Sequence, residues 1–176
     1  MSNLDDPVLR CLVATVALGR ASIRDDVAEV VADELRAADF LVSRSLTVHR
    51  EKEAIEQLVS NVTSSNEADA IILIGGVGIG PRDYTCEAVD ELADRHIEGF
   101  GEAYRRLLVE GLGYGVGAAL VRAAAGACNG SVVLAIPRQA AATTRRVMTG
   151  LIVPLLPEAV RIAAGIARHP ASSRLS

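Results

Sequence analysis

The feature that most constrains the fold is an apolar run, Ala70–Ile74, that passes directly into a glycine-rich segment. The run is rich in isoleucine and predicts a buried strand. Four glycines follow within six residues, and a helix is predicted to begin near Thr85, a good N-cap residue. In open α/β sheets such a loop lies at the carboxyl end of a strand, where ligands bind.

Strand-like and helix-like segments alternate along the chain. Short apolar runs predict strands at 11–17, 40–48, 68–74 and 131–136. Apolar residues at helical spacing predict helices at 24–38, 51–62 and 85–95, and two helical pieces within 98–124. Two closing helices are predicted at 139–153 and 157–167, separated by Pro154 and Pro157. The alternation predicts an α/β three-layer sandwich, with a mostly parallel sheet flanked by helices. We expect one domain, residues 1–176, with flexible ends at 1–9 and 169–176.

Composition excludes several classes of protein. The net charge of -4 argues against a nonspecific nucleic-acid binder, which usually carries a basic patch. No segment resembles a signal peptide, and no apolar run reaches membrane-spanning length. Cys11, Cys86 and Cys128 are far apart, so we expect reduced thiols in a cytoplasmic protein.

The glycine-rich loop points to a phosphate-bearing ligand. Glycines allow close approach of the backbone, and loop amides together with a helix N-terminus favour an anion. Asp83, directly after the glycines, is a candidate ligand for a divalent cation that bridges phosphate oxygens. The alternative is a tight turn in which Asp83 is only a helix-capping acid.

Two further motifs carry less weight. Gly113–Ala118 matches GxGxxA, but it follows a helical stretch instead of a strand, so a dinucleotide site is rejected. Cys86 lies near a helix N-terminus, where a thiolate is stabilised, and it is either a plain first-turn residue or a reactive thiol.

The segment 75–88, GGVGIGPRDYTCEA, closely resembles the GGTGIGPRDVTPEA signature of the MoaB and MogA family, whose fold also occurs in gephyrin. Residues 98–105 resemble the PGFGExFR segment of that family, and residues 122–126 resemble its SRAxAG segment. The similarity runs from about residue 11 to 160.

The resemblance implies a homotrimer of α/β subunits that binds molybdopterin. Active members adenylylate the terminal phosphate of molybdopterin with ATP and Mg²⁺. Carried over by position, Asp83 is the catalytic and metal-binding residue, and the substrate-binding residues are Gly75, Gly76, Val77, Gly78, Gly80, Thr85, Glu87 and Arg50. The stretch 111–126, rich in small residues, is the candidate contact between subunits.

Several of these positions depart from the family pattern. Val77 replaces a loop threonine, Arg50 falls where the family has an aspartate, and Arg138 lies where the family has PGS. Arginine suits phosphate oxygens but repels a metal ion. Glu51, Asp25 and Asp26 are the acids that could compensate. Two functions therefore remain open: a molybdopterin adenylyltransferase with Asp83 on magnesium, and a noncatalytic trimeric binding or assembly paralogue.

Overall fold

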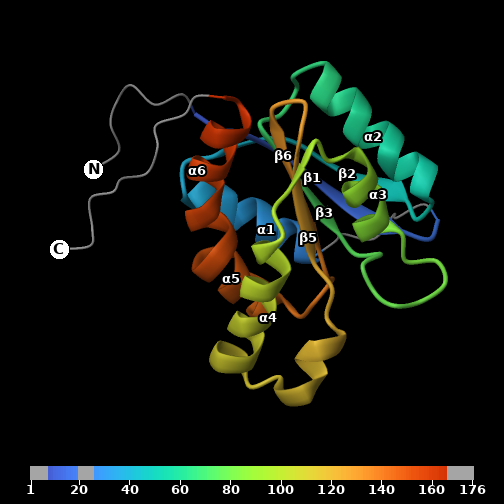
Figure 1. The fold of residues 1–176 in the computed structure, drawn as a ribbon. Coiled ribbons are helices and arrows are strands. Elements are labelled where there is room, and N and C mark those ends of the chain that lie inside the picture. The colour runs from blue at the N-terminus through green and yellow to red at the C-terminus, as the bar shows by residue number, and fades with distance from the viewer. Residues whose placement is uncertain (1–7, 20–25, 166–176) are drawn as a thin grey trace.

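The computed structural model of the chain describes residues 8–19 and 26–165, which form an α/β sandwich of three layers (Figure 1). The central sheet has six strands in the order β2-β1-β3-β6-β5-β4. Across the sheet these are β2 (Leu41–His49), β1 (Arg10–Ala17), β3 (Ala70–Ile74), β6 (Ser131–Ile136), β5 (Ala124–Cys128) and β4 (Arg95–His96). The first four strands are mutually parallel, whereas β5 runs antiparallel to both of its neighbours, so the predicted mostly parallel sheet is confirmed.

Helices cover both faces of the sheet. One face carries α1 (Asp26–Ala37), α4 (Gly99–Leu112), α5 (Ala141–Val147), the π-helix η2 (Met148–Ile152) and α6 (Val153–Ala163). The other face carries α2 (Lys52–Ser64) and α3 (Thr85–Leu92). Because side chains alternate along a strand, β3 supplies Ile72 and Ile74 to the first core and Ile71 and Leu73 to the second. All five residues of β3 are buried, as its uninterrupted apolar run predicts.

The two antiparallel strands were not predicted, and one predicted helix is too long. The helix expected at 85–95 ends at Leu92, and the chain then forms β4, which is only two residues long. The second half of the region 98–124 is not regular α-helix: it contains the 3₁₀-helix η1 (Gly115–Leu120) and leads into β5. The sequence of β5, AAGAC, has no β-branched or aromatic residue. Pairing with β6, and not local propensity, makes this segment a strand.

The closing helices form one continuous rod, and the predicted break at Pro154 and Pro157 is wrong. Residues 141–163 are helical throughout, with the five-residue π turn of η2 directly before α6. A proline ring inside a helix clashes with the carbonyl group four residues earlier. The wider π turn opens the backbone just ahead of Pro154 and so relieves this clash.

The structure describes only the last two residues of the predicted flexible end 1–9, Val8 and Leu9. Leu9 belongs to the fold, because its carbonyl group accepts a hydrogen bond from the Leu41 amide at 2.9 Å. The rest of the predicted flexible ends, 1–7 and 169–176, lies outside the described residues. Within the described ranges, no helix combines the length and the apolarity needed to cross a bilayer.

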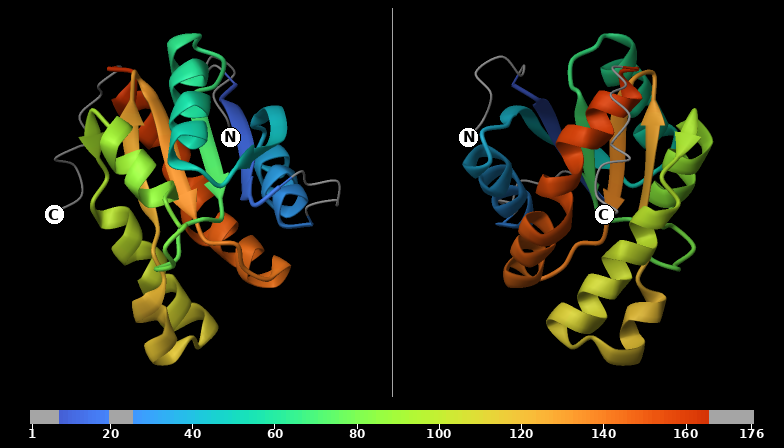
Figure 2. Two further views of the ribbon diagram at one scale, coloured as in Figure 1. Left: turned by 90° about the vertical axis from the view of Figure 1, so that its right-hand side faces the viewer. Right: turned by 60° about the vertical axis from the view of Figure 1, so that its left-hand side comes forward.

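An arm projects from the sandwich. The last turns of α4 and all of η1 extend past the edge at which β3 and β6 end, and the loop that follows β3 lies at that same end (Figure 2). Val116 and Leu120, in η1, are 95% and 66% exposed. The arm therefore presents apolar side chains beside the part of the sheet where a ligand is expected.

We expect Gly126→Ala to destabilise the protein, because a Cβ atom there would lie 2.5 Å from the Ala93 Cβ atom and 3.1 Å from the Arg95 carbonyl oxygen. Overpacking of this kind costs about 1–3 kcal/mol. Urea denaturation followed by circular dichroism measures the change. Gly99→Ala is the control, since a Cβ atom there meets nothing within 4 Å. Equal stability of the two variants would contradict the close pairing of β4 with β5.

Candidate functional site

The carboxyl ends of the four parallel strands meet at one edge of the sheet. β1 ends at Ala17, β2 at His49, β3 at Ile74 and β6 at Ile136. The chain connects β1 to β2 on one side through α1, whereas β3 leads to the opposite side of the sheet through α3. The glycine-rich loop thus follows the strand beside the point at which the connections change direction, the usual ligand position in this architecture.

The loop begins with two glycines in the left-handed region. The φ angles of Gly75 and Gly76 are 97° and 65°, a conformation that side-chain-bearing residues rarely adopt. A Cβ atom at Gly76 would lie 2.5 Å from the Thr85 hydroxyl oxygen and 3.0 Å from a Val16 methyl group. These two glycines therefore turn the chain through a space too narrow for side chains.

Thr85 braces this turn and is not the N-cap that the sequence predicts. It is the first residue of α3, and no side chain caps that helix. Its amide donates to the Gly76 carbonyl at 2.9 Å, and its hydroxyl group donates to the Gly75 carbonyl at 2.8 Å. The hydroxyl group is fully buried in these contacts, so its predicted role in substrate binding can only be indirect.

Asp83 closes the tip of the loop. Its Oδ2 atom accepts a hydrogen bond from the Gly80 amide at 3.1 Å, and its own amide donates to the Gly80 carbonyl at 3.1 Å. Cβ atoms at Gly78 and Gly80 would lie 2.5 Å and 2.9 Å from the same Oδ2 atom. Both glycines are needed so that this carboxylate can fold back over the loop.

Arg50 neutralises Asp83. The Arg50 amide donates to the Ala17 carbonyl at 2.9 Å and so extends the β1–β2 ladder by one residue. From there its Nη2 atom reaches to 3.1 Å from Asp83 Oδ1, and the Asp83 side chain is only 15% exposed. Within the described chain, Arg50 Nε is buried and has no hydrogen-bond partner. The ion pair thus leaves one guanidinium donor unused at the loop.

Two further predicted site residues have defined structural roles. The Val77 side chain is 3% exposed and packs into the core beneath α2 and α3, so it presents no surface to a ligand. Glu87 pairs with Arg122, whose Nη1 atom also donates to the Gly78 carbonyl at 3.0 Å. Arg122 therefore ties the glycine-rich loop to the segment that precedes β5.

Of the acids that could compensate for Arg50, the structure describes Glu51 and Asp26, and Asp26 is the first residue of α1. Glu51 contacts His49 at 3.5 Å and is largely exposed, and Asp25 lies outside the described residues. Among residues 8–19 and 26–165, no three histidine, cysteine, aspartate or glutamate side chains are grouped closely enough to hold a metal ion.

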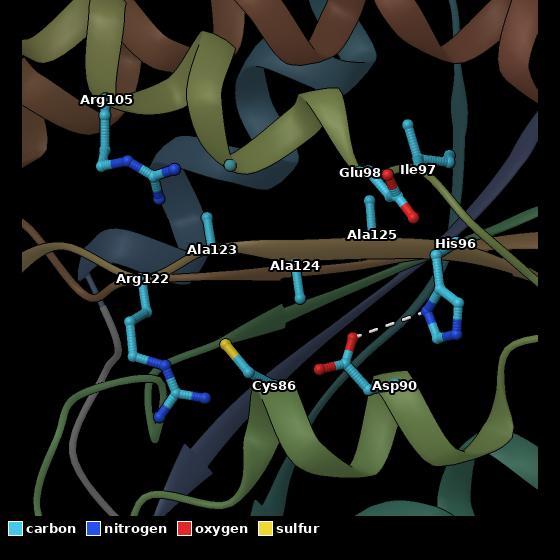
Figure 3. Close-up of a pocket in the computed structure, with 11 residues that line it drawn as sticks. Cys86, Asp90, His96, Ile97, Glu98, Arg105, Arg122, Ala123, Ala124 and Ala125 are labelled. Atoms are coloured by element: carbon cyan, nitrogen blue, oxygen red, sulfur yellow. Dashed lines mark ion pairs between the residues drawn. The ribbon is translucent and has the colours of Figure 1, made fainter.

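A pocket of about 560 Å³ lies next to the loop, and the sequence analysis did not predict it (Figure 3). It lies between α3, α4 and β5 and is lined by Cys86, Asp90, His96, Ile97, Glu98, Gly101, Arg105, Arg122, Ala123, Ala124 and Ala125. Residues 98–105 and 122–126 had been noticed only as motifs. They form opposite parts of one cavity because β5 pairs with β6. This pairing could not be inferred from the sequence, since β5 was not predicted.

Cys86 is a structural residue and not a reactive thiol. It is 3% exposed, and burial raises the pKa of its thiol to about 11 despite the nearby Arg122 guanidinium, which lowers it. Reactive thiols are exposed and have lowered pKa values. The interpretation of Cys86 as a plain first-turn residue of α3 is therefore confirmed.

Comparison with known proteins agrees with this geometry. Residues 10–158 match the family described as "probable molybdopterin binding domain". The chain is 34% identical to molybdenum cofactor biosynthesis protein B of Bacillus cereus over 149 residues, which cover 84% of this chain and 86% of that protein.

Solved structures show the same fold. A crystal structure of a molybdenum cofactor biosynthesis protein B superposes with a TM-score of 0.81 at 31% identity, covering 89% of this chain and 96% of that one. The molybdopterin biosynthesis enzyme MoaB of Thermus thermophilus gives a TM-score of 0.76 at 28% identity, covering 90% of this chain and 98% of that one.

We expect Gly78→Val to weaken anion binding at the loop, because the added Cβ atom would lie 2.5 Å from Asp83 Oδ2 and displace the Asp83 carboxylate. Calorimetric titration with inorganic pyrophosphate should show an affinity at least about tenfold weaker than that of the parent, the loss of about one charge-assisted hydrogen bond. Gly117→Ala, at which a Cβ atom has open space, should bind like the parent. Unchanged affinity of Gly78→Val would place the anion site elsewhere.

Proposed function

The chain belongs to the molybdopterin-binding domain family of molybdenum cofactor biosynthesis proteins, and on that premise we propose that it binds molybdopterin without adenylylating it. The phosphate end of the ligand lies at the glycine-rich loop, residues 75–83. The observation that carries the proposal is the 3.1 Å ion pair between Arg50 and Asp83, which places a cation from the chain itself beside the only carboxylate of residues 75–83; Asp83 Oδ1 is buried and accepts no hydrogen bond within the described chain.

The loop offers what a terminal phosphate requires. Gly75, Gly76, Gly78 and Gly80 bring backbone close to a bound anion, and the N-terminus of α3 adds its dipole. The unused Arg50 Nε atom adds a charged donor. Guanidinium groups suit phosphate oxygens, because several N–H groups point in fixed directions.

A magnesium ion does not fit this donor set. Mg²⁺ requires hard oxygen ligands in near-octahedral geometry, with one or two carboxylates supplied by the protein. Here Asp83 Oδ2 already accepts the Gly80 amide, and Oδ1 faces the Arg50 guanidinium. A metal ion close to Asp83 would also lie close to a permanent positive charge, which repels it. We therefore assign no step to Mg²⁺ or ATP.

The adenylyltransferase alternative rests on Asp83, which holds the position of the family's acid, and it requires that Arg50 be removed. We expect Arg50→Asp to place a second carboxylate beside Asp83 and to create magnesium-dependent turnover with ATP and molybdopterin. The gain should be about 100- to 1000-fold over the parent, the usual effect of one electrostatic stabiliser. Val77 needs no change, since its side chain is buried in the core.

Two variants serve as controls for this assay. Arg50→Gln removes the cation without adding an acid and should stay inactive. Arg44→Asp makes the same charge change elsewhere on β2, where Arg44 pairs with Glu67. Robust magnesium-dependent turnover by the parent protein would overturn the proposed binding role. Turnover by Arg50→Gln as high as that by Arg50→Asp would show that the added acid is not what restores activity.

We also propose a homotrimer in the cytoplasm, assembled through the projecting arm. A hollow of about 370 Å³ at the junction of α4 and η1 is lined by Val109, Gly115, Val116, Ala118 and Ala119, and by the charged residues Arg105, Arg106 and Glu110. Val116 and Leu120 are the exposed apolar residues beside it. A contiguous apolar surface on a protruding element is typical of a contact between protein chains. Three buried free thiols are compatible with a reducing compartment.

We expect the double variant Val116→Asp, Leu120→Asp to be a monomer, because two carboxylates would have to be buried without partners in the interface. Light scattering coupled to size exclusion at micromolar concentration measures the mass. Leu41→Asp, an exposed leucine on the edge strand β2, is the control and should remain trimeric. A monomeric parent protein would contradict the assembly.

A further inference from the structure

Small residues make up part of the lining of the pocket beside the loop. Ala123, Ala124 and Ala125 line it along β5, and Gly101 lines it from α4. A Cβ atom at Gly101 would lie 2.8 Å from the Ala123 carbonyl oxygen, so only glycine lets α4 approach β5 this closely. The volume of about 560 Å³ lies within the range of small-molecule sites. Ala123 and Ala125 point toward α4, whereas Ala124 points toward α3 (Figure 3), so no long side chain of β5 fills the pocket and space for a ring remains.

The two ends of the pocket carry opposite hydrogen-bonding character (Figure 3). Arg105 and Arg122 lie at one end, whereas Asp90, His96 and Glu98 lie at the other. Guanidinium groups only donate hydrogen bonds, and ionised carboxylates only accept them. The pocket therefore fits a ligand that presents acceptors or negative charge at one end and N–H donors at the other.

Asp90 lies at the acceptor end of the pocket, and its side chain is 58% exposed. Cys86 and Asp90 both line the pocket from α3 and are four residues apart, so they lie about 6 Å apart along the helix axis. His96 Nδ1 lies 3.7 Å from Asp90 Oδ1, on the side away from Arg122 (Figure 3). Asp90 is thus about one helical turn further along α3 than Cys86, which lies in the first turn, next to the glycine-rich loop.

We propose that Asp90, with Glu98 as a second acceptor, recognises the adjacent N–H groups of a 2-amino-4-oxopyrimidine ring. This ring edge is shared by pterins and guanine and is absent from adenine. The proposal rests on the proposed function, since the phosphate of the same ligand then lies at the loop. Asp90 and Glu98 are specificity-determining residues in this assignment.

Pterin fluorescence tests the proposal directly, because the chain has no tryptophan to interfere. The parent protein is titrated with 6-hydroxymethylpterin, and quenching or anisotropy gives the affinity. Asp90→Asn replaces one acceptor by a donor and should weaken binding at least about tenfold, the effect of one charge-assisted hydrogen bond. Glu91→Gln is the matched control, since Glu91 is the next residue of α3 and pairs with Lys52 outside the pocket.

Two further measurements test where the ligand binds and which ring the protein recognises. Ala124→Leu adds a long side chain to the pocket on the side of α3 and should abolish pterin binding, while thermal unfolding by circular dichroism checks that the variant folds. Guanosine should compete with the pterin, and adenosine should not. A competition constant for guanosine that is weaker than the dissociation constant of 6-hydroxymethylpterin would identify the pterin as the source of the recognised edge.

The outcomes separate this proposal from the proposed function. Unchanged pterin affinity in Asp90→Asn, or equal competition by adenosine and guanosine, overturns the assignment of Asp90 while molybdopterin binding stands. A parent protein that binds pyrophosphate but no pterin overturns the pocket assignment and leaves the loop as the anion site. A parent protein that binds neither probe, nor molybdopterin itself, overturns the proposed function.

Discussion

The turn at Gly75 and Gly76 is the constraint on which the rest of the site depends. The Gly75 amide is still bonded to the Ile136 carbonyl at 2.9 Å, so the turn begins inside the sheet and not beyond it. Two consecutive left-handed residues then reverse the chain against Thr85, which holds both carbonyl groups. This sets where α3 starts and hence where Cys86 and Asp90 face the pocket. The same turn carries Asp83 to within reach of Arg50.

The electrostatics of the site follow from that placement. Asp83 is largely buried, and an unpaired carboxylate there would lose much of its hydration. Arg50 compensates this charge from the end of β2, and Arg122 compensates Glu87 from the start of β5. Both arginines therefore form ion pairs with acids at or beside the loop in the absence of a ligand. The pattern favours a preformed anion site with fixed donors over a site that assembles around a metal ion.

Prediction from sequence succeeded where local pattern decides the structure. The uninterrupted apolar run of β3 and the glycines that follow it were placed correctly, because burial and backbone freedom can be inferred from residue type. β4 and β5 were missed, since a two-residue strand and the segment AAGAC become strands only through pairing with distant partners. The pocket was missed for the same reason. The role of Thr85 was also missed, because a hydroxyl group that braces a turn and one that caps a helix look alike in sequence.

Arg50 gives the site a cation that cannot dissociate. A bound divalent ion occupies its site only as often as its concentration allows, so a chelator or a fall in free magnesium empties it. A guanidinium group attached to the end of β2 is present at full occupancy in every molecule and stays charged throughout the physiological pH range. The positive charge that balances Asp83 is therefore part of the chain itself and is independent of the supply of metal in the cell.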